Sequence, residues 1–384
     1  MPLIAAGTTV LGQQLCSPGW VDVSGARILD CGPGLPPRPP DVDLPDAVVV
    51  PGFVDIHVHG GGGASYHGPD IMRAAEFHRR HGTTTTLASL LSASHHDLLT
   101  GVRALAEATR AGVVAGIHLE GPWLSAQHCG AHDRRQLRDP QPSEIDALLA
   151  AGDGTIRMVT LAPERPGADD AITRFVDAGV VVAVGHTDAS YEQTQHAVAL
   201  GATVGTHLFN AMRPLHHREP GPVLALLEDA RVTVELIADG VHVHPAVLRA
   251  VIEAAGPERV ALVTDAIAAA GRGDGSFRLA TLDVDVVSGV ARVRGTSTIA
   301  GSTATMDQLF RTVAAGSGLA AAVHMTSTTP AHALGFGDVG SLRAGLNADL
   351  VVLDRDLELT AVMAGGQWVL DDGMSHPHAL RRLT

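Results

Sequence analysis

Eight short β-rich runs alternate with helix-like stretches through the middle of the chain, and this alternation constrains the fold more than any other feature. The runs occupy residues 48–59, 83–90, 113–120, 156–164, 180–186, 204–210, 232–242 and 260–267. The helix-like stretches occupy residues 71–81, 97–110, 143–151, 169–178, 190–200, 223–229 and 245–255, with one more at 302–315 after an interruption at 271–298. Eight strand and helix units predict an α/β fold, a (β/α)8 barrel of the TIM type.

The two ends of the chain do not follow this repeat. Residues 1–50 and 341–384 contain short β-type segments separated by Gly and Pro turns, including the proline-rich residues 36–40. We expect these segments to form one small β-sandwich domain built from both termini. The predicted domains are therefore residues 1–50 plus 341–384, and a barrel of residues 51–340.

Charge and hydropathy exclude several classes of partner. The 384 residues carry a formal net charge of −14, which argues against nucleic acid and anionic membranes as partners. No apolar run approaches the ~20 residues that a membrane helix needs. Residues 1–4 have no basic segment before an apolar one, so we expect no signal peptide. Three cysteines make no disulfide framework and indicate a reducing, cytoplasmic location.

The chain contains no lysine, so all 27 of its basic residues are arginine. This excludes a Schiff-base lysine, a P-loop lysine and a carboxylated lysine that bridges two metal ions. Any bridging ligand must therefore be another kind of side chain.

Polar residues of metal-binding type follow the predicted strands at their carboxyl ends, where catalytic groups of such barrels lie. His57 and His59 are two residues apart on one run, so both rings face the same side, as in half of a metal site. The other runs end in or near His118, Glu120, His186, His207, His242 and Asp265. A lone strand-end histidine is more commonly an ordinary hydrogen-bonded residue, but six such ends on one rim are hard to explain by packing.

These residues form a candidate ligand set for one or two divalent metal ions. The set contains four histidines with one Glu and one Asp: His57, His59, His186, His207, Glu120 and Asp265. Without a lysine, Glu120 is the obvious bridging group. Asp265 also suits proton transfer, because a carboxylate beside a metal's water ligand can accept a proton and deliver it to a leaving group.

The chain resembles the amidohydrolase superfamily, and within it the family of N-acetylglucosamine-6-phosphate deacetylases. The matching segments are PGFVDIHVHG at 51–60, HLEGP at 118–122, THLFNAM at 206–212, REPG at 218–221, ADGVH at 238–242 and LVTDA at 262–266. They extend over essentially the whole chain. The resemblance implies a metal-dependent hydrolysis that releases acetate from an N-acetyl amino sugar 6-phosphate.

The resemblance also implies the chemistry of individual residues. Glu120, His186 and His207 hold the main metal, whose water attacks the acetyl carbonyl. Asp265 acts as general base and then as general acid toward the amine. His242 donates to the carbonyl oxygen and stabilises the developing negative charge.

Binding roles follow from the same resemblance. Asn210 and the backbone N–H of Ala211 contact the phosphate, and His132 contacts the sugar. Arg218 also binds phosphate and can come from the neighbouring subunit of a homodimer. Because His57 and His59 are both present, a second metal ion is expected, with zinc as the first choice and Fe, Mn, Co or Cd as alternatives.

Three alternatives stay open at this point. The first is another amidohydrolase, acting on a cyclic amide or on a related N-acetylhexosamine phosphate. The second is a barrel that keeps the fold but only binds or assembles. The third concerns Cys129, which lies between Glu120 and His132 in a stretch of small and polar residues. It is either a small filler or a reactive, regulatory thiol.

Overall fold

The computed structural model describes residues 2–12 and 14–369, and the chain divides into two compact units. The first unit contains Met1–Asp55, Glu76–Thr85 and Met306–Thr384, and the second contains Ile56–Ala75 and Thr86–Thr305. The domain boundaries expected after residues 50 and 340 stay a prediction. Residues 370–384 of the expected terminal domain lie outside the described residues.

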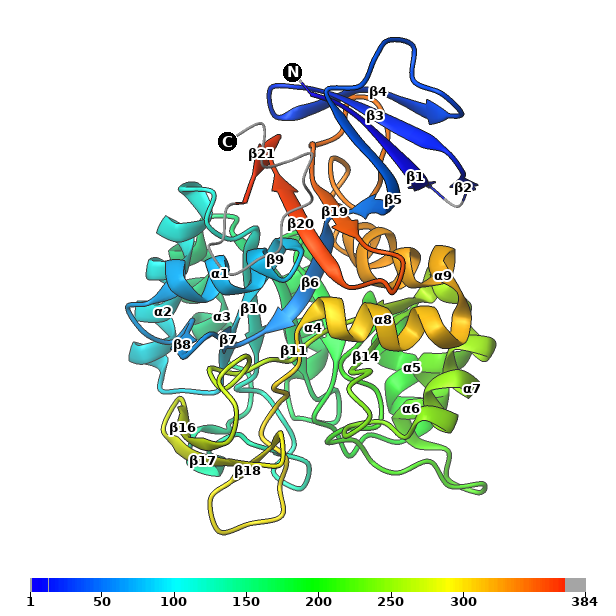
Figure 1. Ribbon diagram of the computed structural model, residues 1–384. Coiled ribbons are helices and arrows are strands. Elements are labelled where there is room, and N and C mark those ends of the chain that lie inside the picture. The colour runs from blue at the N-terminus through cyan, green and yellow to red at the C-terminus, as the bar shows by residue number, and fades with distance from the viewer. Residues whose placement is uncertain (1, 13, 370–384) are drawn as a thin grey trace. The chain divides into compact units, whose positions relative to one another are not determined.

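A sheet of eight strands forms the barrel, and its strands are neighbours in chain order (Figure 1). They are β6 (Phe53–Val58), β9 (Thr83–Leu91), β10 (Gly116–Glu120), β11 (Ile156–Leu161), β12 (Val181–Val184), β13 (Ala202–Gly205), β14 (Thr233–Leu236) and β15 (Val260–Leu262). The pairs from β9 to β15 are parallel. Backbone hydrogen bonds join the end of the first strand to the segment that follows the last. They run from the Asp265 N–H to the His57 carbonyl (2.9 Å) and from the His59 N–H to the Ala266 carbonyl (2.8 Å). The predicted barrel is therefore confirmed.

Helices connect the successive strands, as the alternation predicts. They are α1 (Ile71–Arg80), α2 (His95–Arg110), α3 (Pro142–Gly152), α4 (Ala168–Asp177), α5 (Tyr191–Leu200), α6 (Gly221–Glu228) and α7 (Pro245–Ala255). Local signals explain several ends. Helix α5 begins with a capping box between Ser190 and Gln193 and ends at Gly201, whose backbone is left-handed. Helix α2 buries Leu98, Val102 and Leu105, which recur at helical spacing on one face.

The strands of the two termini form one mixed sheet in the first unit (Figure 1). Its order is β21 (Gln367–Trp368), β20 (Leu359–Ala364), β19 (Leu350–Leu353), β5 (Val42–Pro51), β1 (Leu3–Leu11), β3 (Gly19–Ser24) and β4 (Arg27–Pro33), with β2 (Gln14–Cys16) paired to β1. Strand β5 pairs antiparallel with β19 and so joins the two ends of the chain. One apolar core contains Ile4 and Val21 together with Val352 and Met363. The predicted small β-domain is confirmed.

The first unit also contains α8 (Met306–Ser317), α9 (Leu319–Val323), a π-helix (His324–Thr328) and α10 (Thr329–Ala333). None of the helices in the described part of the chain combines the length and the apolar character that crossing a bilayer requires.

The first predicted run, 48–59, is two strands instead of one. It divides at Gly52, so β5 ends at Pro51 in the terminal sheet and β6 begins at Phe53 in the barrel. A Cβ atom at Gly52 would lie only 2.1 Å from the Thr84 hydroxyl. The close approach of β9 at this point explains why the residue between the two sheets lacks a side chain.

The interruption at 271–298 contains a sheet that the sequence reading did not predict. Its antiparallel strands are β16 (Gly275–Leu279), β17 (Leu282–Val287) and β18 (Val290–Val293). Its apolar side chains, among them Leu279 and Val284, pack in one cluster with Leu91 and Ile267 of the barrel. The insertion therefore has a fixed apolar attachment beside the carboxyl ends of the barrel strands.

Candidate active site

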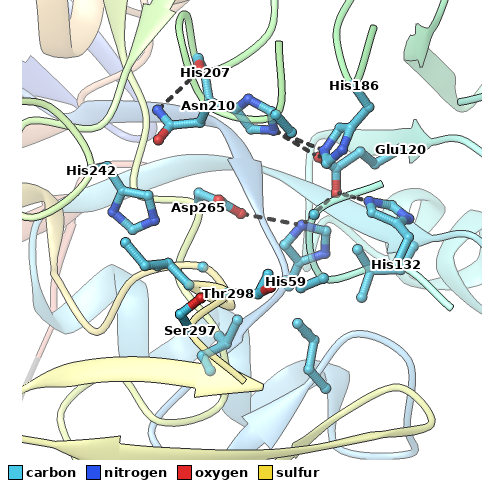
Figure 2. A pocket seen from close by; sticks show the side chains of 18 residues that line it. His59, Glu120, His132, His186, His207, Asn210, His242, Asp265, Ser297 and Thr298 are labelled. Atoms are coloured by element: carbon cyan, nitrogen blue, oxygen red, sulfur yellow. Dashed lines mark hydrogen bonds and ion pairs between the residues drawn. The ribbon is translucent and has the colours of Figure 1, made fainter. Parts of the chain in front are cut away.

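A pocket of about 290 Å³ lies at the carboxyl ends of the barrel strands (Figure 2). Nine of the residues that line it were predicted as site residues: His59, Glu120, His132, His186, His207, Asn210, Ala211, His242 and Asp265. The insertion contributes Leu279, and the segment after it contributes Ser297 and Thr298. Residues distant in the sequence thus meet in one cavity.

Glu120 is the centre of the site, because the Nε2 atoms of five histidines surround its carboxylate. One oxygen, Oε1, lies 2.9 Å from His186, 3.1 Å from His207 and 3.4 Å from His57. The other, Oε2, lies 3.1 Å from His59 and 3.3 Å from His132. Figure 2 shows four of these rings, those of His59, His132, His186 and His207, around this one side chain. The predicted bridging position of Glu120 fits this geometry.

Asp265 lies on the other side of the histidine pair. Its Oδ1 atom is 3.4 Å from His59 Nε2 and 3.6 Å from His57 Nε2. The side chains of both histidines and of Glu120 are almost completely buried, whereas Asp265 keeps 13% of its side chain exposed. Asp265 can therefore reach both the ligand cluster and a molecule in the pocket.

Contacts at Nδ1 indicate which nitrogen of three histidines faces the cluster. Each Nδ1 lies against an oxygen that accepts hydrogen bonds: His186 against the His128 carbonyl (2.9 Å), His59 against the Ser89 carbonyl (3.2 Å) and His57 against Glu235 (3.0 Å). In a neutral ring Nδ1 then carries the proton and Nε2 presents a lone pair. These lone pairs point at carboxylate oxygens, which are also hydrogen-bond acceptors. Two facing acceptors repel each other unless a cation lies between them, so this geometry suits a bound metal ion.

The carboxylates also favour positive charge at these rings, which either a proton or a metal ion can supply. Burial alone would lower the pKa of His59, but its hydrogen bonds to Asp265 and Glu120 raise it to about 9. Burial would raise the pKa of Asp265, but the neighbouring His57 and His59 lower it to about 2. Protons and metal ions compete for such ligands. The carboxylates therefore demand positive charge on the rings or between them.

Three groups of residues each bring their donor atoms within 4.8 Å of one another. They are His57, Glu120 and His207; His57, His59 and Asp265; and Glu120, His132 and His186. Imidazole nitrogen with carboxylate oxygen is a donor set that zinc and related divalent ions accept. The residues present fit a metal centre, and the overlap of the groups fits more than one ion.

His242 is held separately, on the opposite wall of the pocket from His132 (Figure 2). Its Nδ1 donates to Asp239 Oδ2 at 2.7 Å, and Asp239 also accepts the backbone N–H groups of Val241 and His242. Burial alone would lower the pKa of His242, but the hydrogen bond and the charge of Asp239 raise it. This fixes the ring and favours a protonated imidazole with a donor left at Nε2.

Strained backbone marks the strand ends at this site. His186, His207, Ala211 and Asp265 have φ angles of 47°, 26°, 51° and 46°, in the left-handed region that residues with side chains avoid. Each such residue costs on the order of 1–3 kcal/mol, and such residues concentrate at active sites. The strain explains why β12, β13 and β15 end sooner than the apolar runs predict.

Two of the predicted site residues, His57 and Arg218, are not among the residues that line the pocket. His57 is buried, with its Nε2 atom 3.4 Å from Glu120 Oε1. Arg218 lies exposed in the loop before α6, where its guanidinium contacts the His217 ring at 2.8 Å. Cys129 is half-buried, and its thiol lies 3.7 Å from the carbonyl of Gly130, a pocket residue.

The sequence reading missed two buried residues that support the ligands. Glu235, on β14, contacts His57, and Ser89, on β9, contacts both His59 and His118. Glu235 is the more detectable of the two, because a charged residue in an apolar barrel strand needs a partner.

Comparison with known proteins identifies the family. The model of the family described as "Amidohydrolase family" matches residues 48–369. The chain belongs to the amidohydrolase family. The match includes the barrel, the histidine pair at the end of β6 and the strands that carry or precede the remaining ligands.

Individual relatives within the amidohydrolase family are similar over most of their length. N-acetyl-D-glucosamine-6-phosphate deacetylase from Mycobacterium smegmatis, solved as a mutant in complex with N-acetyl-D-glucosamine-6-phosphate, is 54% identical, with a TM-score of 0.94 over 96% of this chain and 99% of that one. N-acetylgalactosamine-6-phosphate deacetylase from Escherichia coli O157:H7 is 37% identical over 92% of this chain and 97% of its own. Human N-acetylglucosamine-6-phosphate deacetylase is 35% identical over 85% and 84%.

Proposed function

We propose that this protein hydrolyses the acetamide of N-acetyl-D-glucosamine 6-phosphate to glucosamine 6-phosphate and acetate. The observation that carries the proposal is the convergence of five imidazoles on Glu120, with Asp265 against two of them, at the carboxyl ends of the barrel strands. Relatives of up to 54% identity named for this reaction support the same substrate class. A cyclic-amide hydrolase is less well supported, because the relatives named above act on amino-sugar phosphates.

We assign the metal ligands to two overlapping positions. Glu120, His186 and His207 would hold the main ion, and His57, His59 and Asp265 would contribute to a second, with zinc as the proposed metal. A bound divalent ion polarises a carbonyl oxygen and lowers the pKa of its water ligand toward neutrality. Glu120 would contact both positions, because its two oxygens face different histidines.

Asp265 would move the proton. It lies beside the histidine pair and keeps part of its side chain open to the pocket, so its carboxylate can accept a proton from the attacking water. It would then deliver that proton to the departing amine. His242, held by Asp239, would donate from Nε2 to the acetyl oxygen, where negative charge develops. His132 would contact the sugar ring.

The phosphate would lie toward Asn210 and Ala211, which line the pocket. We propose that Arg218 completes this subsite in a second copy of the chain, so that the active form is a homodimer. Exposure of Arg218 outside its own pocket supports this arrangement. The guanidinium of an arginine binds phosphate through two parallel hydrogen bonds. Such a local attraction is needed here, because the protein's net charge of −14 repels an anionic substrate at long range. A phosphorylated substrate and three free cysteines support a cytoplasmic location.

The substrate assignment has one specific competitor. The relative from Escherichia coli O157:H7 is named as an N-acetylgalactosamine-6-phosphate deacetylase, so the epimer at carbon 4 is a second candidate. Acetate release should be measured from the glucosamine, galactosamine and mannosamine forms of the N-acetylhexosamine 6-phosphates. The proposal expects the highest kcat/KM with the glucosamine form. A higher value with the galactosamine form would assign the protein to the second candidate.

Replacing Arg218 with alanine should penalise the phosphorylated substrate specifically. Loss of a charged, bidentate phosphate contact is expected to raise KM by roughly 10- to 100-fold for the phosphorylated sugar, with little change for unphosphorylated N-acetylglucosamine. Steady-state kinetics with both sugars measure the difference, and Arg213→Ala in the same loop is a matched control. Equal loss of kcat/KM for both sugars would make Arg218 a structural residue.

Replacing His57 and His59 together with glutamine should remove one metal ion and leave the other. The parent protein is expected to bind up to two divalent ions per chain, because the two histidines supply donors that the Glu120, His186 and His207 set does not need. Elemental analysis of parent and variant after metal loading gives the two stoichiometries. A parent protein that never exceeds one ion under metal-replete conditions would contradict the second position.

A further inference from the structure

Glu235 is a fully buried carboxylate that the proposed mechanism does not use. It lies in the middle of β14, a strand whose other residues are apolar or threonine, and its side chain has 0% exposure. Burying a carboxylate costs several kcal/mol unless it is well paired, and an apolar residue of the same size usually serves stability better. Its presence in the barrel therefore needs an explanation beyond packing.

One oxygen of Glu235 reaches two of the proposed metal ligands. Oε2 lies 3.0 Å from Nδ1 of His57, on β6, and accepts the backbone N–H of His207 at 3.1 Å. The backbone carbonyl of Glu235 also accepts the N–H of Leu208, the next residue, at 2.9 Å. A single residue thus holds a side chain from one strand and the strained turn that follows β13.

The two ligands that Glu235 holds belong to different parts of the cluster. His57 is a member of two donor groups, one with Glu120 and His207 and one with His59 and Asp265. A rotation of its ring would change both groups at once. The other oxygen of Glu235, Oε1, has no hydrogen-bond partner within the described residues. The oxygen of Glu235 that is hydrogen-bonded is thus the one that faces the metal cluster.

We propose that Glu235 is a positioning residue that fixes His57 with the proton on Nδ1 and the Nε2 lone pair toward the metal cluster, and so determines occupancy of the second metal position. The inference rests on the proposed metal-dependent function. A carboxylate that accepts from Nδ1 sets the tautomer and the orientation of a ligating histidine and makes its Nε2 a stronger donor. The bond to His207 ties the same carboxylate to the turn that carries a ligand of the main ion.

Two substitutions separate positioning from packing. Glu235→Leu removes both hydrogen bonds of Oε2, although the carbonyl bond to Leu208 is kept. Affinity for the second ion should then fall by roughly 10- to 100-fold. Affinity for the first ion should fall less, because Glu120 and His186 do not contact Glu235 and stay in place. Glu235→Gln can keep an oxygen at the same place, so it should restore most of the lost affinity. Glu144→Gln, at a buried carboxylate that pairs with Arg138 and Trp123, is the matched control and should bind both ions normally.

Metal binding should be measured directly, without relying on activity. Stripped protein is titrated with Zn²⁺ by calorimetry and with Co²⁺ by its visible absorption, which reports ligand geometry. In Glu235→Leu the absorption change of the second Co²⁺ equivalent should weaken or shift. An unchanged second affinity together with an unchanged cobalt spectrum in that variant would overturn the proposal.

A measurement on the unmodified protein covers the case in which Glu235→Leu does not fold. Nitrogen NMR of the zinc-loaded parent should show His57 protonated at Nδ1 and not at Nε2. The opposite tautomer would refute the positioning role. These outcomes are independent of the substrate, so a protein that releases no acetate but shows the expected metal and tautomer results would refute the proposed function alone.

Discussion

Replacing Asp265 with asparagine should lower kcat by roughly 10²–10⁴ while metal stays bound. Asparagine keeps the shape and one oxygen of the side chain, so the contacts near His57 and His59 can persist. It cannot accept a proton from the attacking water or deliver one to the amine. Because the loss lies in the chemical step, KM should change much less than kcat.

The test of this prediction needs two measurements on the same preparation. Steady-state kinetics give kcat and KM, and elemental analysis gives the metal content. Asp239→Asn is an informative comparison, since Asp239 acts only through His242 and its loss should cost less. Near-normal turnover of Asp265→Asn would remove Asp265 from the proposed role. Loss of both ions along with activity would make metal binding, and not proton transfer, the main role of Asp265.

Replacing Glu120 with glutamine should cause the largest loss, on the order of 10³ or more in kcat/KM, together with loss of metal. Both carboxylate oxygens lie within 3.4 Å of histidine Nε2 atoms. An amide puts an N–H donor where one oxygen faced the cation, so the two metal positions lose their shared ligand. The five imidazoles alone do not balance the charge of two divalent ions.

Metal content and kcat/KM of Glu120→Gln should be compared with those of Glu144→Gln. Glu144 is also a buried carboxylate of the barrel unit, but its partners are Arg138 and Trp123 instead of the histidine cluster. The control should keep its metal and its activity. A Glu120→Gln protein that retains two ions and full activity would show that Glu120 bridges nothing.

The barrel and most of its site could be predicted from sequence because the pattern is regular. Each predicted strand is followed by a helix, so all strands run in the same direction and the polar residues at their carboxyl ends lie on one rim of the barrel. His57 with His59, and Glu120 with His186 and His207, were found in this way and do line one cluster. The physical reason is that parallel strands share direction, which makes position along a strand equivalent to position in space.

The parts that the sequence did not reveal depend on contacts between distant residues. The run 48–59 looks continuous, and only the close approach of Thr84 to Gly52 shows why it divides. The insertion at 271–298 supplies apolar residues such as Leu279 and Val284, but its core is completed by Leu91 and Ile267 of the barrel unit. Glu235 is a charged residue in an apolar strand, and the sequence does not show its partner, because His57 lies 178 residues away in the chain.

Acetate release from N-acetylglucosamine 6-phosphate by metal-stripped and by metal-reconstituted protein tests the central claim most directly. The stripped protein should be inactive, and activity should return on addition of up to two equivalents of Zn²⁺. Acetate and glucosamine 6-phosphate should then form in equal amounts. Reconstituted protein that releases no acetate from the phosphorylated sugar, or stripped protein that is as active as the reconstituted form, would contradict the account of a metal-dependent deacetylase.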